Sequence, residues 1–177
     1  VFALLLTATA LVYWTYQLFL DHLGLPTSLF GLLYAVGFIA SASGSWVAEE
    51  LNKWLGFRST LLLAILTTSG TMVVMGSATG WWAAGLPLVT QFLTGYLLPS
   101  LRYLLQERAN SESRATLLSL ESMMQRGLLT MATVAFGVAS SSVGLDRALQ
   151  AAGVVVLVLT LPLLPFAFRA QSDVSTI

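Results

Sequence analysis

Long runs of apolar residues follow one another along this chain, and they are continuous rather than alternating between hydrophobic and polar positions. Continuous runs of about 20 apolar residues predict membrane-spanning helices, whereas the strands of a membrane barrel alternate. The stretch 59–101 carries no charge, and it is long enough for two spans folded at the small residues 76–80. The pattern predicts six spans, at about 1–20, 28–48, 59–77, 82–105, 114–140 and 148–168.

The composition agrees with a chain made almost entirely of spans. Hydrophobic residues make up 56% of the 177 residues and charged residues only 9%, against about 25% charged in a typical soluble domain. This balance excludes a soluble enzyme, a disordered chain and a nucleic-acid partner, and it makes the lipid bilayer the expected surroundings. The chain has no cysteine, which excludes disulfides and thiolate metal sites, and we expect neither a metal nor a cofactor.

The basic residues of the connections gather on one predicted side of the membrane. That side holds Lys53, Arg58, Arg102, Arg108, Arg114 and Arg169, whereas the other side holds only Arg147. Because cytoplasmic loops are enriched in Lys and Arg, the distribution predicts a multi-pass protein of the plasma or inner membrane with both termini in the cytoplasm.

Two segments of the predicted cytoplasmic side look familiar. The segment 44–58 reads GSWVAEELNKWLGFR, and it resembles the loop between the second and third helices of each half of major facilitator superfamily transporters. In that resemblance Glu49 or Glu50 takes the acidic place. The segment 110–120, NSESRATLLSL, resembles the cytoplasmic start of the eleventh helix in bacterial members. The loops of a cytoplasmic gate would then include Gly44, Glu49, Lys53, Gly56, Arg58, Arg108 and Arg114.

This resemblance implies an all-α integral membrane fold, namely the C-terminal half of a twelve-helix transporter, with helices seven to twelve forming two inverted three-helix repeats. The chain begins at Val1 inside an apolar run, which is typical of a fragment. The implied partners are the missing N-terminal six-helix half, or a second copy, and a small-molecule substrate. The implied function is secondary active transport of a small solute by alternating access, and proton-coupled efflux of a drug or metabolite is one form that fits.

Polar residues inside the fifth predicted span follow one helical face. These are Ser119, Ser122, Arg126, Thr130 and Thr133, at spacings of three and four residues. An arginine facing lipid costs about 2.5–3.5 kcal/mol. Arg126 is therefore a candidate cavity residue that binds an anionic group or joins a proton-linked ion pair. The alternative is that Arg126 extends to the headgroups or pairs structurally with the absent half.

Polar residues of other spans extend the candidate substrate cavity. The first span carries Tyr13, Tyr16 and Gln17 on one face, and an interfacial aromatic belt is the alternative interpretation. The complete candidate set is Tyr13, Tyr16, Gln17, Gln91, Gln125, Arg126 and Thr130. Pro99 predicts a kink in the fourth span. His22 lies beside Asp21 in an outer loop with no further metal ligands near it in sequence.

Two other classes of membrane protein compete with a transporter. An intramembrane serine protease needs a Gly-x-Ser-Gly motif and a histidine within a span. Here Ser41 stands where the first glycine of Gly-x-Ser43-Gly44 is needed, and the one histidine lies in a predicted loop. We therefore expect no enzyme. A channel or a non-transporting membrane scaffold stays open as the alternative function.

Overall fold

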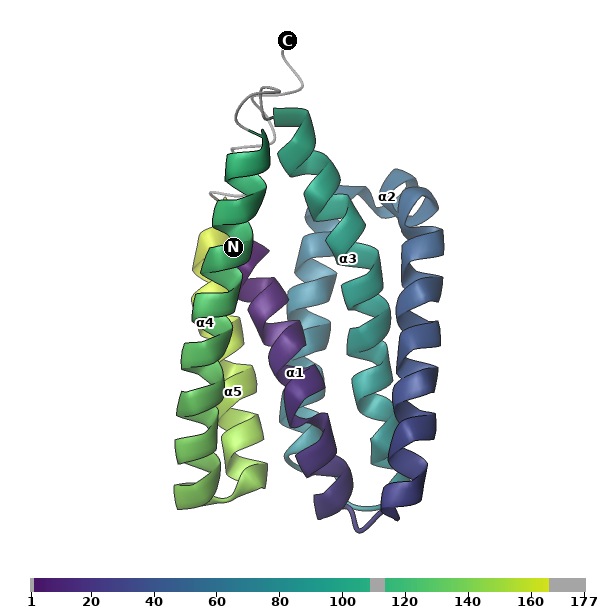
Figure 1. Ribbon diagram of the computed structural model, residues 1–177, viewed down its shortest axis with the longest axis vertical. Coiled ribbons are helices and arrows are strands. Elements are labelled where there is room, and N and C mark those ends of the chain that lie inside the picture. The colour runs from purple at the N-terminus through teal and green to yellow at the C-terminus, as the bar shows by residue number, and fades with distance from the viewer. Residues whose placement is uncertain (1, 109–113, 166–177) are drawn as a thin grey trace.

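The computed structural model describes residues 2–108 and 114–165, which form helices and turns without a strand (Figure 1). The α-helices are α1 (Phe2–His22), α2 (Phe30–Met75), α3 (Leu86–Arg108), α4 (Arg114–Val143) and α5 (Leu145–Thr160). Short 3-10 helices occur at Thr27–Leu29, Trp81–Gly85 and Leu161–Leu163. The α-helices lie side by side along the long axis of the molecule.

Helix α2 is folded back on itself at Gly56. The backbone of this residue has φ 68° and ψ 154°, a conformation that only glycine adopts without strain. The two halves of α2, 30–55 and 57–75, therefore run in opposite directions, and Figure 1 shows the reversal at one end of the bundle. The connection expected over 49–58 is thus largely helical, and the change of direction is confined to Gly56.

The other turns lie at the opposite end of the bundle, where the chain passes between α1 and α2, α2 and α3, and α4 and α5. Each contains one glycine with positive φ: Gly24 at 70°, Gly80 at 99° and Gly144 at 89°. All three positions fall within stretches of small and turn-forming residues in the sequence. Glycine adopts positive φ at no steric cost, which is why short turns between helices use it here.

Among the residues that the structure describes, four segments are long and apolar enough to cross a membrane: Ala3–His22, Thr27–Leu51, Arg58–Met75 and Leu145–Leu163. The protein is therefore all-α in the described residues, with several helices of the length and composition of membrane spans. Helices α3 and α4 are not among the four. Each carries polar groups within its length, such as Gln91 in α3 and Arg126 in α4, so their place in a membrane stays a prediction.

Buried apolar side chains hold the helices together in two clusters. One is built around Tyr16, Phe19, Met72 and Leu149, and the other around Leu5, Leu61, Ile65 and Tyr96. The second half of α2 contributes to both, because its buried positions include Leu61, Ile65, Thr68, Met72 and Met75, at intervals of three and four residues. That spacing places them on one helical face, which lies in the interior of the bundle.

Helices α2 and α3 cross at very close range. A methyl group on Gly44 would collide with the carbonyl of Phe92, and one on Gly95 would collide with the carbonyl of Ser41. The hydroxyl of Ser45 donates a hydrogen bond to the carbonyl oxygen of Gly95, at 2.8 Å. Small residues at such crossings let two backbones approach, which is how helices associate where lipid removes the hydrophobic driving force.

Candidate functional site

The predicted cavity residues of α1 lie in a group of aromatic rings that α2 completes. The ring of Tyr34 is 5.4 Å from that of Tyr13 and 5.3 Å from that of Tyr16, measured between centroids. Phe38 lies 6.3 Å from Tyr13. Such edge-on and tilted contacts are the favourable geometry for aromatic pairs. Sequence reasoning missed Tyr34 and Phe38, although their spacing of four residues places them on one face of a helix.

Within this group the three predicted residues differ in exposure. Tyr16 is buried, and its hydroxyl donates to the carbonyl oxygen of Ala84 at 2.8 Å. Its single donor is therefore used inside the protein, and Tyr16 anchors α1 against the turn before α3. Tyr13 is half-buried and Gln17 is exposed. A solute approaching this face could therefore meet the amide of Gln17 and one edge of Tyr13.

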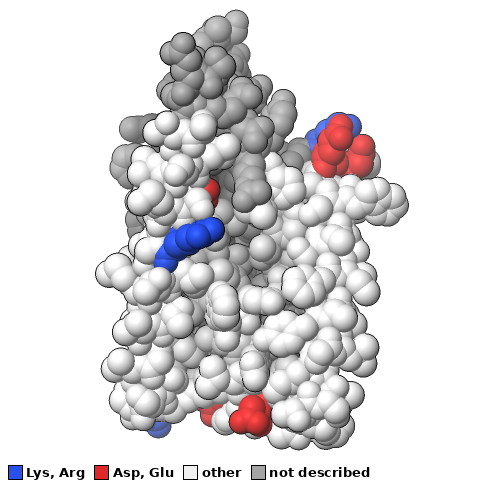
Figure 2. Space-filling view, viewed as in Figure 1, with Lys and Arg blue, Asp and Glu red and all other residues white. Residues whose placement is uncertain are grey.

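The predicted residues of α4 form a second group. Arg126 is exposed, and no carboxylate among the described residues forms an ion pair with it. Figure 2 shows basic atoms over α4, on a face whose middle is otherwise largely uncharged. Thr130 donates its hydroxyl to the carbonyl oxygen of Arg126 at 2.9 Å, within the same helix. Gln125 is half-buried. This group therefore offers a guanidinium and an amide to a ligand from outside the bundle.

Gln91 lies apart from both groups, in the contact between α3 and α2. Its Cγ would be 3.5 Å from a methyl group placed on Gly37, and the side chain is half-buried. Among the described residues, no hydrogen bond or ion pair joins the candidates of α1, α3 and α4 to one another. The candidate cavity is thus spread over three helices of the bundle.

The residues predicted for a cytoplasmic gate fall into helical rather than loop positions. Gly44 is buried at the crossing of α2 and α3. Lys53 pairs with Glu49 at 2.9 Å and with Glu50 at 3.2 Å. Hydrogen bonding to Glu49, and then to Glu50, raises the pKa of Lys53 above its usual value. The spacings of four and three residues put these charges on one helical face, which explains why the helix continues to Gly56.

Three further gate candidates lie around the ends of helices. Arg58 is exposed at the start of the second half of α2. Arg108 ends α3 and Arg114 begins α4, and the side chains of these two arginines lie outside the described residues. The segment between them, 109–113, also lies outside the described part of the chain, and it includes the first four residues of the second family-like motif.

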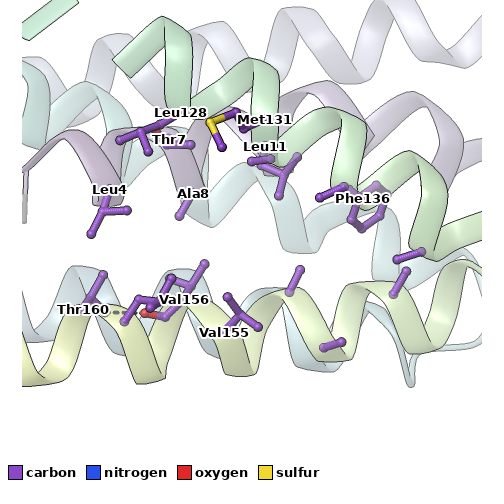
Figure 3. Close-up of a pocket in the computed structure, with 17 residues that line it drawn as sticks. Leu4, Thr7, Ala8, Leu11, Leu128, Met131, Phe136, Val155, Val156 and Thr160 are labelled. Carbon is purple, nitrogen blue, oxygen red and sulfur yellow. Dashed lines mark hydrogen bonds between the residues drawn. The ribbon is translucent and has the colours of Figure 1, made fainter. Parts of the chain in front are cut away.

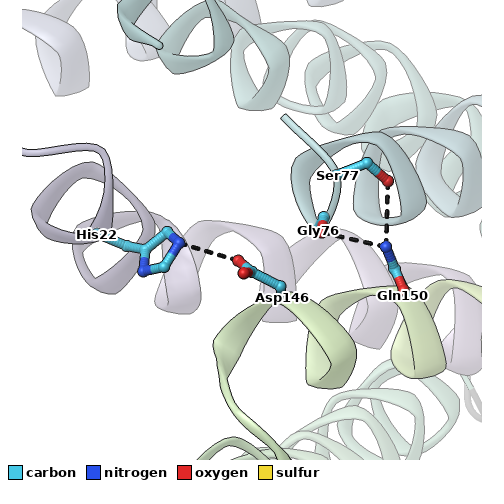
Figure 4. A network of polar contacts seen from close by, with 5 residues as sticks. All are labelled: His22, Gly76, Ser77, Asp146 and Gln150. Atoms are coloured by element: carbon cyan, nitrogen blue, oxygen red, sulfur yellow. Dashed lines mark hydrogen bonds and ion pairs between the residues drawn. The ribbon is translucent and has the colours of Figure 1, made fainter. Parts of the chain in front are cut away.

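A polar network at the turn end of the bundle was not foreseen from the sequence (Figure 4). His22 Nε2 lies 2.9 Å from Asp146 Oδ1. Gln150 Nε2 donates to the carbonyl oxygen of Gly76 and to Ser77 Oγ, both at 3.1 Å. The contacts join the ends of α1 and α2 to the start of α5. His22 lies in the last turn of α1 and Asp146 in the first turn of α5, the helix ends at which a basic and an acidic side chain are respectively favourable.

A groove lies between α1, α4 and α5 (Figure 3). It has a volume of about 450 Å³ and is lined almost entirely by apolar side chains, among them Leu11, Met131, Phe136, Val155 and Val156. None of the predicted cavity residues lines it. Its two hydroxyls, on Thr7 and Thr160, donate to carbonyl oxygens of their own helices, at 2.7 Å and 2.6 Å. The groove thus offers volume and apolar contact without a free hydroxyl proton.

Two further findings concern metal binding and similarity to known proteins. The described residues hold no cluster of three or more His, Cys, Asp or Glu side chains that could bind a metal ion. No family model matches the chain, and neither a curated protein nor a solved structure matches it.

Proposed function

We propose that this chain is the C-terminal six-helix half of a secondary active transporter of the kind that the major facilitator superfamily comprises, and that it moves a small solute by alternating access. The observation that carries the proposal is the placement of Gln17 and Arg126. Both are exposed on the surface of a bundle of long apolar helices. In a membrane, polar groups in such positions need water or a polar partner.

A second half that covers Gln17 and Arg126 would supply both. In transporters built from two related bundles, the solute site lies between the bundles near the middle of the membrane. Arg126, near the middle of α4, could there bind an anionic group of the solute or a carboxylate of the other half. Tyr13 and Gln17 would add ring contact and hydrogen bonding from α1.

The proposal requires α3 and α4 to cross the membrane together with the four apolar spans. Helix α3 has 23 residues and α4 has 30, which correspond to lengths of about 35 and 45 Å. Both exceed the hydrocarbon core of roughly 30 Å. They also run beside the apolar helices for most of their length, so they would share the same depth. The two halves of α2 together with α1 would then form one three-helix repeat, and α3, α4 and α5 the other.

The two ends of the bundle support the proposed orientation. The end that carries the reversal at Gly56 also carries Lys53 and Arg58. The turn end carries Asp21, His22, Asp146 and Arg147 among the described residues. Basic residues favour the cytoplasm, so we place the Gly56 end inside and the turns at Gly24, Gly80 and Gly144 outside.

Counterflow in proteoliposomes tests the function. Vesicles containing the full-length protein are loaded with an unlabelled mixture of small organic anions, amines and sugars, and the uptake of each labelled compound is followed. A carrier gives uptake that saturates with concentration and is accelerated by the same compound inside, because its site faces one side at a time. Uptake that rises linearly without acceleration would point to a channel. The absence of uptake for every compound, from protein whose fold is verified, would favour a scaffold.

A further inference from the structure

The groove between α1, α4 and α5 has the chemistry of a hydrocarbon site. Small side chains on facing helices, such as Ala8, Ala132 and Ala152, create the hollow, and larger apolar groups line the rest. The hydroxyls of Thr7 and Thr160 are already donated within their own helices. A polar solute entering the groove would lose its hydrogen bonds to water without replacement, which is unfavourable, whereas an apolar solute has no such bonds to lose.

The shape of the groove suits a long and thin occupant. Its lining along α5 runs from Ala148 to Thr160, a rise of about 18 Å. Its volume of about 450 Å³ lies within the range of about 300–1,000 Å³ found for small-molecule sites. The groove follows the helix axes for more than half of the roughly 30 Å hydrocarbon core. It therefore lies parallel to the direction in which lipid chains run.

The groove opens to the surroundings of the bundle. Met131, Val155 and Leu159 line it and are 72%, 52% and 50% exposed. Two of its walls, α1 and α5, include candidate membrane spans, and only 22% of the α5 span is buried inside the protein. The exposed remainder of an apolar span contacts hydrocarbon, so lipid chains are the molecules that reach the opening at the highest concentration.

We propose that this groove binds one acyl chain of a membrane lipid, held between α1 and α4 on one side and α5 on the other (Figure 3). The proposal rests on the membrane location of the helices and not on transport. Burial of a methylene group is favoured over its exposure to water, but the relevant competitor is the bilayer itself. A bound chain is therefore distinguished by slower exchange than lipid at a flat helix surface.

Photolabelling with a lipid that carries a diazirine in its acyl chain tests the proposal. The full-length protein is reconstituted in vesicles of this phosphatidylcholine, diluted into excess unlabelled phosphatidylcholine vesicles with a lipid-exchange carrier, and irradiated at intervals. Adjacent residues of α5 provide matched positions: Val155 and Leu159 line the groove, whereas Val154 and Val158 do not and are 52% and 60% exposed. We expect label at the groove residues to persist several-fold longer than label at their neighbours.

Two variants sharpen the test. Ala152→Phe fills the groove and should abolish the slow component, whereas Val154→Phe adds the same ring outside the groove and should leave it intact. Equal decay at all four wild-type positions would overturn the proposal, because the groove would then hold only exchanging bulk lipid. Label at Val154 and Val158 but never at Val155 and Leu159 would also overturn it and indicate that a second protein surface covers the groove. The wild-type comparison decides the matter even if Ala152→Phe does not fold.

Discussion

Arg126 is the residue for which two interpretations predict the most different free energies: one in which its side chain faces lipid, and one in which it lines a solute path. Its side chain is exposed and forms no ion pair with the described carboxylates. If it faced lipid, it would cost about 2.5–3.5 kcal/mol, and removing it would improve membrane insertion. If it faces the solute path, removing it leaves folding almost unchanged and takes away the charge that a solute or a partner carboxylate requires.

We therefore expect Arg126→Ala to lower the rate of counterflow by about tenfold or more, the effect of losing an interaction worth about 1.4 kcal/mol or more. The midpoint of unfolding in detergent should change little, because substitutions at exposed positions usually alter stability by less than about 0.5 kcal/mol. Arg126→Lys, which keeps the charge, should retain part of the activity. Arg147→Ala at the turn end is the matched control, and wild-type counterflow in Arg126→Ala would remove this residue from the site.

The crossing of α2 and α3 gives a prediction that does not depend on function. Gly95→Ala puts a methyl group against the carbonyl of Ser41, so the helices must move apart, at a cost of about 1–3 kcal/mol. Gly70→Ala is the control, since Gly70 lies within α2 with nothing within 4 Å of the added methyl group. Alanine there should stabilise the helix by about 0.5–1 kcal/mol. The two unfolding midpoints should shift in opposite directions, and a neutral Gly95→Ala would contradict the close crossing.

Single residues also show where sequence reasoning is limited. The period of three and four residues places Tyr13, Tyr16 and Gln17 on one side of α1, but it does not say how deeply each is buried. Tyr16 is buried and bonded to Ala84, 68 positions away. That contact depends on the packing of α1 against the turn before α3. Gly44 shows the same limit, because its small size suited both a loop end and the helix crossing where it lies.

At the scale of elements, α2 shows how one glycine decides the topology. It has 46 residues, which in a straight helix would extend about 69 Å, more than twice the hydrocarbon core. Gly56 divides it into two lengths that each fit the core. The charges of Glu49, Glu50 and Lys53 stabilise the helix right up to this point. The charge spacing was visible in the sequence, but it was interpreted as a loop because charges interrupt the apolar pattern.

We expect Gly56→Ala to destabilise the protein by about 1–3 kcal/mol, because alanine at φ 68° and ψ 154° is strained. Alanine also favours continuation of the helix, so both the backbone strain and the helix propensity of alanine disfavour the reversal of direction. Thermal unfolding followed by circular dichroism measures the effect. Gly127→Ala in α4 is the control, since its added methyl group meets nothing within 4 Å. Equal midpoints for the two variants would show that the reversal does not depend on the glycine conformation.

The network at the turn end illustrates a second limit at this scale. Sequence reasoning placed His22 beside Asp21 and gave it no further partner, yet His22 pairs with Asp146. The position of each at the favourable end of its own helix was visible in the sequence. Which helix ends meet depends on how α1 and α5 are placed around α2, and no local pattern encodes this. The contact between His22 and Asp146 is largely exposed, so it contributes no more than about 1 kcal/mol.

At the scale of the whole molecule, composition and periodicity predicted an all-α chain with helices of membrane-spanning length. The positions of the turns followed from their glycines. The groove between α1, α4 and α5 was not predictable, because its lining residues come from three helices and each has an ordinary apolar pattern. Helices α3 and α4 remain the open point of the six-span prediction, since their polar residues serve equally well for a solute path or for a surface outside the membrane.

The arrangement of the ends predicts a labelling pattern that resolves this point. The chain has no cysteine, so single cysteines give a signal without background. We would introduce Trp54→Cys beside the Gly56 reversal, Ser77→Cys at the turn between α2 and α3, and Ser141→Cys in the last turn of α4, just before the turn to α5. All three positions are exposed. A membrane-impermeant maleimide is then applied to intact cells and, separately, to inside-out vesicles.

We expect Ser77→Cys and Ser141→Cys to react in intact cells and Trp54→Cys to react only in inside-out vesicles, because the Gly56 end carries Lys53 and Arg58 and basic residues favour the cytoplasmic side. A fourth variant has cysteine in place of exposed Ala115 in the first turn of α4. It shows whether α3 and α4 cross the membrane or lie outside it. If these helices cross the membrane, the new cysteine labels with Trp54→Cys. If they lie outside it, the new cysteine labels with Ser77→Cys, and the six-span prediction is then wrong. If instead every cysteine reacts only from the side opposite to the one expected, the orientation of the protein is reversed and the number of spans is unchanged.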